Sequence, residues 1–130
     1  MGHSNGSGSG TSYLYFSYNG GGIGSITQNG TTAVAYNTSS DQRLKTNIID
    51  APSAIDSIKA IKIRSFDWKA DNSHVDYGWI TQELLETAPE MVHVPSDPDE
   101  MQGADYSKIT PRLTKAVQEI ITRLEALESK

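Results

Sequence analysis

The side chains most able to take part in a reaction lie together between Ser39 and Ile48. A serine becomes a nucleophile when a base removes its proton, and a lysine can be that base, as in the Ser–Lys variants of nucleophilic catalysis. Ser40 and Lys45 are the candidate pair, because no suitably tuned histidine accompanies them. A lysine that acts as a base must be neutral, and burial or a neighbouring cation would favour that form. The chemistry predicted for this segment is serine-based cleavage of a peptide bond.

Two further residues of this segment have alternative roles. Arg43 could be the neighbouring cation or could donate hydrogen bonds to an oxyanion, and Asp41 could orient Arg43 or cap a turn. Residues five apart point to opposite faces of a strand and are not aligned on a helix. The dyad therefore requires a bend, or a Lys45 supplied by another subunit. Taken alone, the sequence from Ser40 to Lys45 favours a capped turn with solvated charges.

The composition of the chain changes at the same place. Residues 1–39 contain no Asp, Glu, Lys or Arg, so every formal charge lies from Asp41 onward. Residues 1–10 are rich in Gly and Ser, as in a flexible linker or an appended tag. Residues 11–39 alternate short β-prone runs with Asn-Gly turn signals, which predicts short strands that pack closely against identical neighbours in a fibre. The alternative is a disordered glycine-rich tail.

From residue 40 to residue 130 the pattern is that of a small α+β domain. Ile55, Ile58 and Ile61 have helical spacing, and the stretch Ile61–Trp68 alternates as a half-buried strand does. The further elements that we expect are a strand at Val75–Ile80, a helix at Gln82–Ala88, a strand at Met91–Val94 and a loop at Ser96–Met101. A domain of this size would have a modest core, and a partner chain would help it.

The last segment, residues 107–130, carries the clearest periodicity. Its apolar residues follow alternating steps of four and three, which is typical of a coiled-coil helix. These residues are Leu113, Val117, Ile120, Leu124 and Leu127. We expect Ser107 or Thr110 to cap the helix and Pro111 to lie in its first turn. Self-association through this seam is predicted, and the alternative is a helix packed on its own domain.

Several function classes are disfavoured by composition. The net charge is −5 and Lys and Arg are not clustered, which argues against nucleic-acid binding. No apolar run is long enough for a membrane helix, no secretory signal is visible, and cysteine is absent. His3, His74 and His93 have no ligand-like spacing, so we expect no metal, and no phosphate-binding loop or other cofactor motif is found.

The segment Ser40–Ile48 resembles the SDxRxKxNI signature of the intramolecular chaperone auto-processing domains at the ends of phage endosialidases, tailspikes and L-shaped tail fibres. Later blocks of the chain are similar to later blocks of that family, in the same order. They are Phe66–Lys69, Tyr77–Glu83, Pro89–Val92 and Asp105–Ile109. The stretch before the motif, which ends at Ser39, is similar to the fibre ends that such domains follow.

The resemblance implies a self-cleaving serine endopeptidase that acts once per chain. It implies that residues 40–130 form the chaperone, which trimerises through residues 107–130, folds the upstream fibre as its client, and is cut off between Ser39 and Ser40. Its catalytic residues would be Ser40 and Lys45, with Asp41, Arg43 and Asn47 in support. Folding and cleavage would take place in the host cytoplasm during virion assembly, after which the fibre stays on the virion tail and the domain is released.

The sequence leaves two alternatives open. Ser40 could attack the carbonyl of Ser39 in its own chain, giving an ester that water hydrolyses, or it could attack another chain of the trimer. In the other functional class, the protein is a trimeric fibre tip that is never cut and binds a receptor through exposed aromatics such as Tyr13, Tyr15 and Tyr18.

Overall fold

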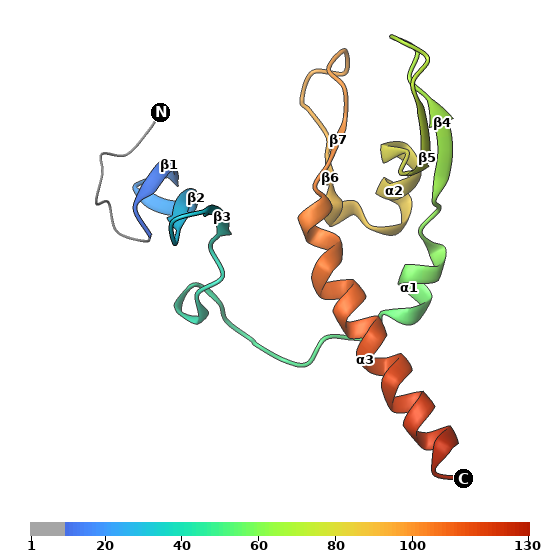
Figure 1. The fold of residues 1–130 in the computed structure, drawn as a ribbon. Coiled ribbons are helices and arrows are strands. Elements are labelled where there is room, and N and C mark those ends of the chain that lie inside the picture. The colour runs from blue at the N-terminus through green and yellow to red at the C-terminus, as the bar shows by residue number, and fades with distance from the viewer. Residues whose placement is uncertain (1–9) are drawn as a thin grey trace. The chain divides into compact units, whose positions relative to one another are not determined.

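The computed structural model describes residues 10–130, and the chain divides into two compact units between Ile49 and Asp50. Figure 1 shows the elements of both units in chain order. The predicted leader lies outside the described residues except for Gly10. The fold class is α+β, as predicted, with strands and helices mixed and a long helix at the C-terminal end.

The first unit is built on a three-stranded antiparallel sheet in the order β1–β2–β3. Its strands are β1 (Ser12–Tyr18), β2 (Gly21–Asn29) and β3 (Ala33–Thr38). Asn19 and Gly20 connect β1 to β2 with φ values of 48° and 80°. Tight hairpin turns need this left-handed backbone at both central residues, which Asn-Gly supplies. The turns predicted from the Asn-Gly pairs are therefore present.

The second unit carries the remaining regular elements, with two small sheets. In chain order they are α1 (Ile55–Ala60), β4 (Arg64–Asp67), β5 (His74–Gly78), α2 (Thr81–Thr87), the 3₁₀ turn η2 (Pro89–Met91), β6 (Val92–His93), β7 (Gly103–Ala104), the 3₁₀ turn η3 (Tyr106–Lys108) and α3 (Ile109–Glu128). β4 pairs with β5 and β6 with β7, both antiparallel. All of these elements except β7 and the 3₁₀ turns were predicted from the sequence.

The core of the second unit is small. Leu84, Ala88 and Met91 are fully or almost fully buried and form its centre. The partly buried apolar residues packed against them are Ile61, Trp79, Val92, Ala104 and Ile109. The rings of Trp79 and Tyr106 stack at 4.4 Å, so that the start of α3 is tied to the segment before α2. This packing joins the end of α1, the α2–η2 segment and the first turn of α3.

Two predictions of local structure were wrong in detail. The strand expected from Ile61 begins only at Arg64, because Ile61 turns into the core at the end of α1. Neither Ser107 nor Thr110 caps α3, whose N-cap is Lys108 and which has no side-chain capping bond. The capping side chain at this end is that of Asp105, the N-cap of η3, whose Oδ1 accepts hydrogen bonds from the Ser107 N–H (3.0 Å) and the Ser107 hydroxyl (2.6 Å). Pro111 lies in the first turn of α3, where it was expected.

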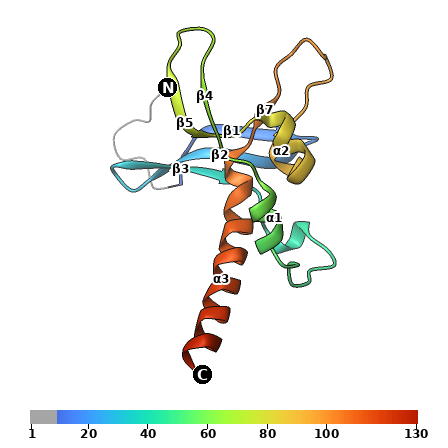
Figure 2. The same ribbon diagram turned by 90° about the vertical axis from the view of Figure 1, so that its right-hand side faces the viewer.

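Helix α3 extends beyond the rest of its unit, as Figures 1 and 2 both show. The five residues of the predicted seam lie on this helix and are 43% to 66% exposed. Helix α3 also packs on its own unit over part of its length: Ile109 joins the core, Ala116 is buried, and α3 contacts α1. Among the described residues, no helix is both long and apolar enough to cross a membrane.

Candidate active site

A single capped turn organises the predicted catalytic segment. Residues Gln42–Leu44 form the 3₁₀ turn η1, and Asp41 is its N-cap in an extended conformation. One oxygen of the Asp41 carboxylate accepts the backbone N–H of Arg43 at 2.8 Å. The Lys45 N–H then donates to the carbonyl of Gln42 at 3.0 Å and closes the turn. The chain bends through Asp41–Leu44, so that Lys45 comes back close to Ser40.

This bend brings the two predicted catalytic side chains together. The Nζ of Lys45 lies 2.7 Å from the Oγ of Ser40, within hydrogen-bonding distance. The requirement set by their spacing is met within one chain, because the capped turn supplies the bend that a straight strand or helix lacks. With the lysine protonated, Nζ donates to the serine; a neutral lysine at this distance could accept the hydroxyl proton instead. Both side chains are exposed to solvent in the single chain.

Asp41 fills both of the roles that the sequence left open. Besides capping the turn, its carboxylate accepts hydrogen bonds from Arg43 Nε at 3.0 Å and from Arg43 Nη2 at 2.8 Å. The guanidinium is the main cause that lowers the pKa of Asp41, with the Arg43 N–H and the charge of Lys45 adding to it. The pKa of Arg43 is raised in return by the same pair. Arg43 is thus engaged with Asp41.

Asn47 contributes through its backbone. It lies in a bend after the turn with a φ of 51°, in the left-handed region. Asparagine tolerates this conformation better than most residues with a side chain. Asn47 therefore changes the direction of the chain after Lys45, and its supporting role in the site stays a prediction.

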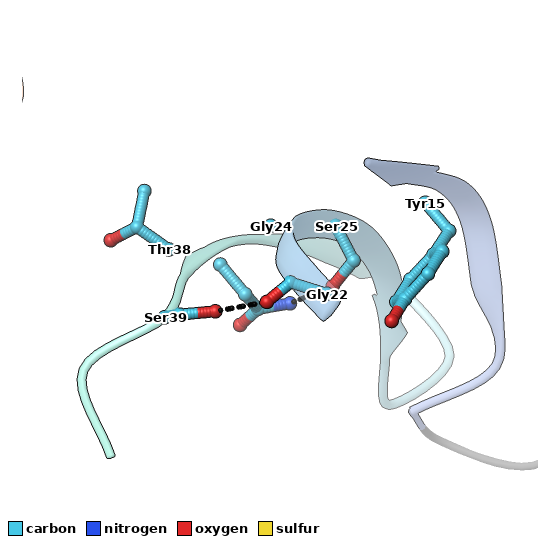
Figure 3. Close-up of a pocket in the computed structure, with 7 residues that line it drawn as sticks. Tyr15, Gly22, Gly24, Ser25, Thr38 and Ser39 are labelled. Carbon is cyan, nitrogen blue, oxygen red and sulfur yellow. Dashed lines mark hydrogen bonds between the residues drawn. The ribbon is translucent and has the colours of Figure 1, made fainter. Parts of the chain in front are cut away.

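The residue before the predicted cut is fixed on the sheet. Ser39 follows the last residue of β3, and its hydroxyl donates to the carbonyl of Gly22 at 2.9 Å, as Figure 3 shows. Its backbone N–H donates to the carbonyl of Ile23 at 3.3 Å. These two partners on β2 could not be predicted, because pairing across strands depends on register, which a single sequence shows poorly.

The second unit has polar contacts of its own. His74 sits on the β4–β5 hairpin, where its Nδ1 is 2.6 Å from the Asp67 carboxylate and its Nε2 is 3.1 Å from the Ser65 hydroxyl. Across residues 10–130, no group of three or more His, Cys, Asp and Glu could hold a metal ion. His3 lies outside the described residues.

Comparison with known families places this segment. Residues 40–93 match the model of a peptidase family, S74, described as the chaperone of endosialidase. The match begins at Ser40, includes the capped turn and reaches His93 at the end of β6. A search of curated proteins found no match.

The family gives the coarse function of the segment. The chaperone-of-endosialidase match supports an intramolecular chaperone from a phage tail fibre, in a family of self-cleaving peptidases. Its first residue is Ser40, the residue that the sequence analysis expected to stand directly after the cut.

Proposed function

We propose that the chain is the C-terminal intramolecular chaperone of a phage tail fibre or tailspike, and that it releases itself by cutting between Ser39 and Ser40. The observation that carries this proposal is the 2.7 Å contact between Lys45 Nζ and Ser40 Oγ, held in one chain by the Asp41-capped turn. A nucleophile held by its base is the arrangement that serine-based cleavage requires. The upstream sheet would be the folding client.

The reaction proceeds in two steps. Neutral Lys45 takes the hydroxyl proton of Ser40, and Oγ bonds to the carbonyl carbon of Ser39. The bond from that carbon to the Ser40 nitrogen then breaks, and the lysine returns its proton to the leaving amine, which leaves an ester. Water hydrolyses the ester, giving a carboxylate on Ser39 and restoring the Ser40 hydroxyl. Attack by Ser40 on a neighbouring chain would produce the same ends.

Solvent exposure of the dyad links cleavage to assembly. Lys45 is exposed in the single chain, and water favours a charged lysine over a neutral one. A homotrimer formed through α3 would bring other chains against the site and remove water from it. Cleavage would then follow trimer formation, in the host cytoplasm, and the released domain would leave the fibre on the virion tail. One cut per chain makes the assembly irreversible.

Intact mass spectrometry tests the central claim. We expect the wild-type chain to yield two fragments that meet at Ser39 and Ser40, whereas Ser40→Ala and Lys45→Ala remain whole. Lys69→Ala removes an exposed lysine from the β4–β5 hairpin and is the matched control, which should cleave as the wild type does. A wild-type chain that stays intact under all conditions of assembly would refute self-cleavage.

A second candidate is suggested by the exposed aromatics of the sheet. Tyr15, Tyr18 and Tyr36 are 64%, 70% and 77% exposed. A trimeric fibre tip could use such rings to bind a receptor without any cleavage. Strand aromatics also pack against neighbouring chains in a fibre, and the dyad geometry has no purpose in a tip. A chain that stays whole and binds cells would favour this candidate.

A further inference from the structure

The bond that is proposed to break lies between two fixed points of the first unit. On one side, Ser39 is held on β2 by its hydroxyl at Gly22 and by its backbone N–H at Ile23. On the other side, Ser40 is held by Lys45 across the capped turn. In Figure 3 the side chain of Thr38, one residue earlier, extends away from Gly22 while that of Ser39 points to it. Ser39 is thus the last residue that β2 holds.

We propose that Ser39 is a positioning residue for the cut, and that its contacts with β2 make cleavage depend on the pairing of β2 with β3. The inference rests on the proposed function. Attack on a carbonyl is fast only when the reacting atoms are held in a narrow range of geometry. The turn fixes the nucleophile, and the sheet fixes the residue that carries the carbonyl. Without the sheet, the backbone torsions on either side of the Ser39–Ser40 peptide bond would be less restricted, and the carbonyl of Ser39 would sample more orientations relative to Ser40 Oγ.

The register that places Ser39 is specified by neighbouring side chains. Asn37 on β3 donates from Nδ2 to the Ser25 hydroxyl at 3.2 Å and to the Thr27 hydroxyl at 3.0 Å, both on β2. A slip of one residue would break these bonds and turn Ser39 to the other face of the sheet. The hydroxyl of Ser39 therefore reaches Gly22 only in the native register.

Glycine at position 24 allows the two strands to approach at this end. Gly24 is opposite Thr38, and a Cβ there would lie 2.9 Å from the carbonyl oxygen of Asn37. Since that oxygen belongs to the backbone, β3 would have to move. At Gly21, by contrast, a Cβ would meet nothing closer than the Tyr18 carbonyl at 3.5 Å, an ordinary contact. Gly24→Ala should therefore disturb the pairing of β2 with β3, whereas Gly21→Ala replaces a glycine of the same strand without a clash.

The hydroxyl contact is tested by cleavage rates of the full chain, pulse-labelled in cell-free translation. We expect Ser39→Ala to be cut about three- to tenfold more slowly than wild type, as the loss of one hydrogen bond predicts. Thr38→Ala, the matched control, should keep the wild-type rate, and Ser39→Thr should restore it because it keeps the hydroxyl. The pH profile should keep its shape in Ser39→Ala, since the proton-transferring groups are unchanged.

The outcomes separate the two claims. If the wild type is not cut at all, the proposed function fails. If the wild type is cut and Ser39→Ala matches Thr38→Ala, or Ser39→Thr fails to restore the rate, the positioning role is overturned and the dyad stands. Gly24→Ala should slow the cut while Gly21→Ala does not. Equal rates for these two variants would overturn the dependence on strand pairing.

Discussion

At the scale of single residues, Asp41 serves the site mainly as a backbone cap. Its carboxylate makes an ion pair with Arg43, but the two side chains are 44% and 89% exposed. Exposed ion pairs contribute about 0 to 1 kcal/mol and are screened by salt. A side-chain cap contributes about 1 kcal/mol and fixes the backbone that turns Lys45 toward Ser40. The hydrogen bond from Asp41 to the backbone therefore matters more to the turn than the ion pair with Arg43.

Two substitutions at this position separate the roles. Asp41→Asn keeps an oxygen that can accept the Arg43 N–H but removes the charge, so we expect cleavage close to the wild-type rate. Asp41→Ala removes both, and we expect cleavage about fivefold slower, because the cap that shapes the turn is lost. The measurement is the rate of fragment formation by intact mass. If the asparagine variant is as slow as the alanine variant, the charge matters more than the cap.

The residues of the candidate site were proposed from the sequence, but the contacts that they make could not be. Ser40 and Lys45 follow from side-chain chemistry and from the family motif. Their 2.7 Å contact depends on a bend whose presence the sequence required without showing how it forms. The anchoring of Ser39 by Gly22 depends on strand register, to which no local sequence feature points.

At the scale of elements, an ion pair connects β4 to α2. Arg64 donates to the two oxygens of Glu83 at 2.8 Å and 2.5 Å, and Lys62 lies 3.5 Å from the same carboxylate. The hydrogen bond from Arg64 is the main cause that lowers the pKa of Glu83 from 4.5 to about 2. This contact links the base of the β4–β5 hairpin to α2.

The pH dependence of unfolding tests this contact. A carboxylate with a lowered pKa in the folded state stabilises the protein above its unfolded pKa, and this contribution is lost as pH falls from about 4.5 to about 2. We expect Glu83→Gln to lower the midpoint of thermal unfolding at neutral pH and to flatten its fall across this window. Glu86→Gln, on the same helix, is the control and should follow the wild type. Parallel curves for the two variants would contradict the assignment.

Elements were predicted well where one physical pattern dominated. The Asn-Gly turns and the alternating runs gave all three strands of the first sheet, and α1, α2 and α3 follow from helical spacing and prolines. Prediction failed at ends and in short elements. Asp105 caps the last helical segment because a 3₁₀ turn precedes α3, and the two-residue strand β7 has too few residues to carry a pattern.

At the scale of the whole molecule, the apolar surface of α3 is the feature that a single chain leaves unsatisfied. The seam of Leu113, Val117, Ile120, Leu124 and Leu127 is about half exposed, and Ile121 beside it is 48% exposed. Among the described residues, the fully buried apolar set is small: Ala54, Leu84, Ala88, Met91 and Ala116. A chain with a small core and an exposed heptad seam gains stability when identical helices cover the seam. The trimer proposed above meets this need.

A substitution in the seam tests both the trimer and its link to cleavage. In a Ser40→Ala background, which keeps the chain whole, we expect the protein to sediment as a trimer and the added Leu124→Glu to yield monomers. Each chain would lose about 2 kcal/mol of apolar burial and would place a charge in the seam. The matched control is Glu125→Gln, next to it and outside the seam.

With Ser40 restored, the same variant decides what activates the dyad. If burial by neighbouring chains makes Lys45 neutral, Leu124→Glu should be cut far more slowly than Glu125→Gln, although the site lies in the other unit of the chain. The rate in the wild type should also fall on dilution below the concentration at which trimers form. A monomeric Leu124→Glu chain that is cut as fast as the control would show that the capped turn is sufficient, and that assembly serves only the folding of the fibre.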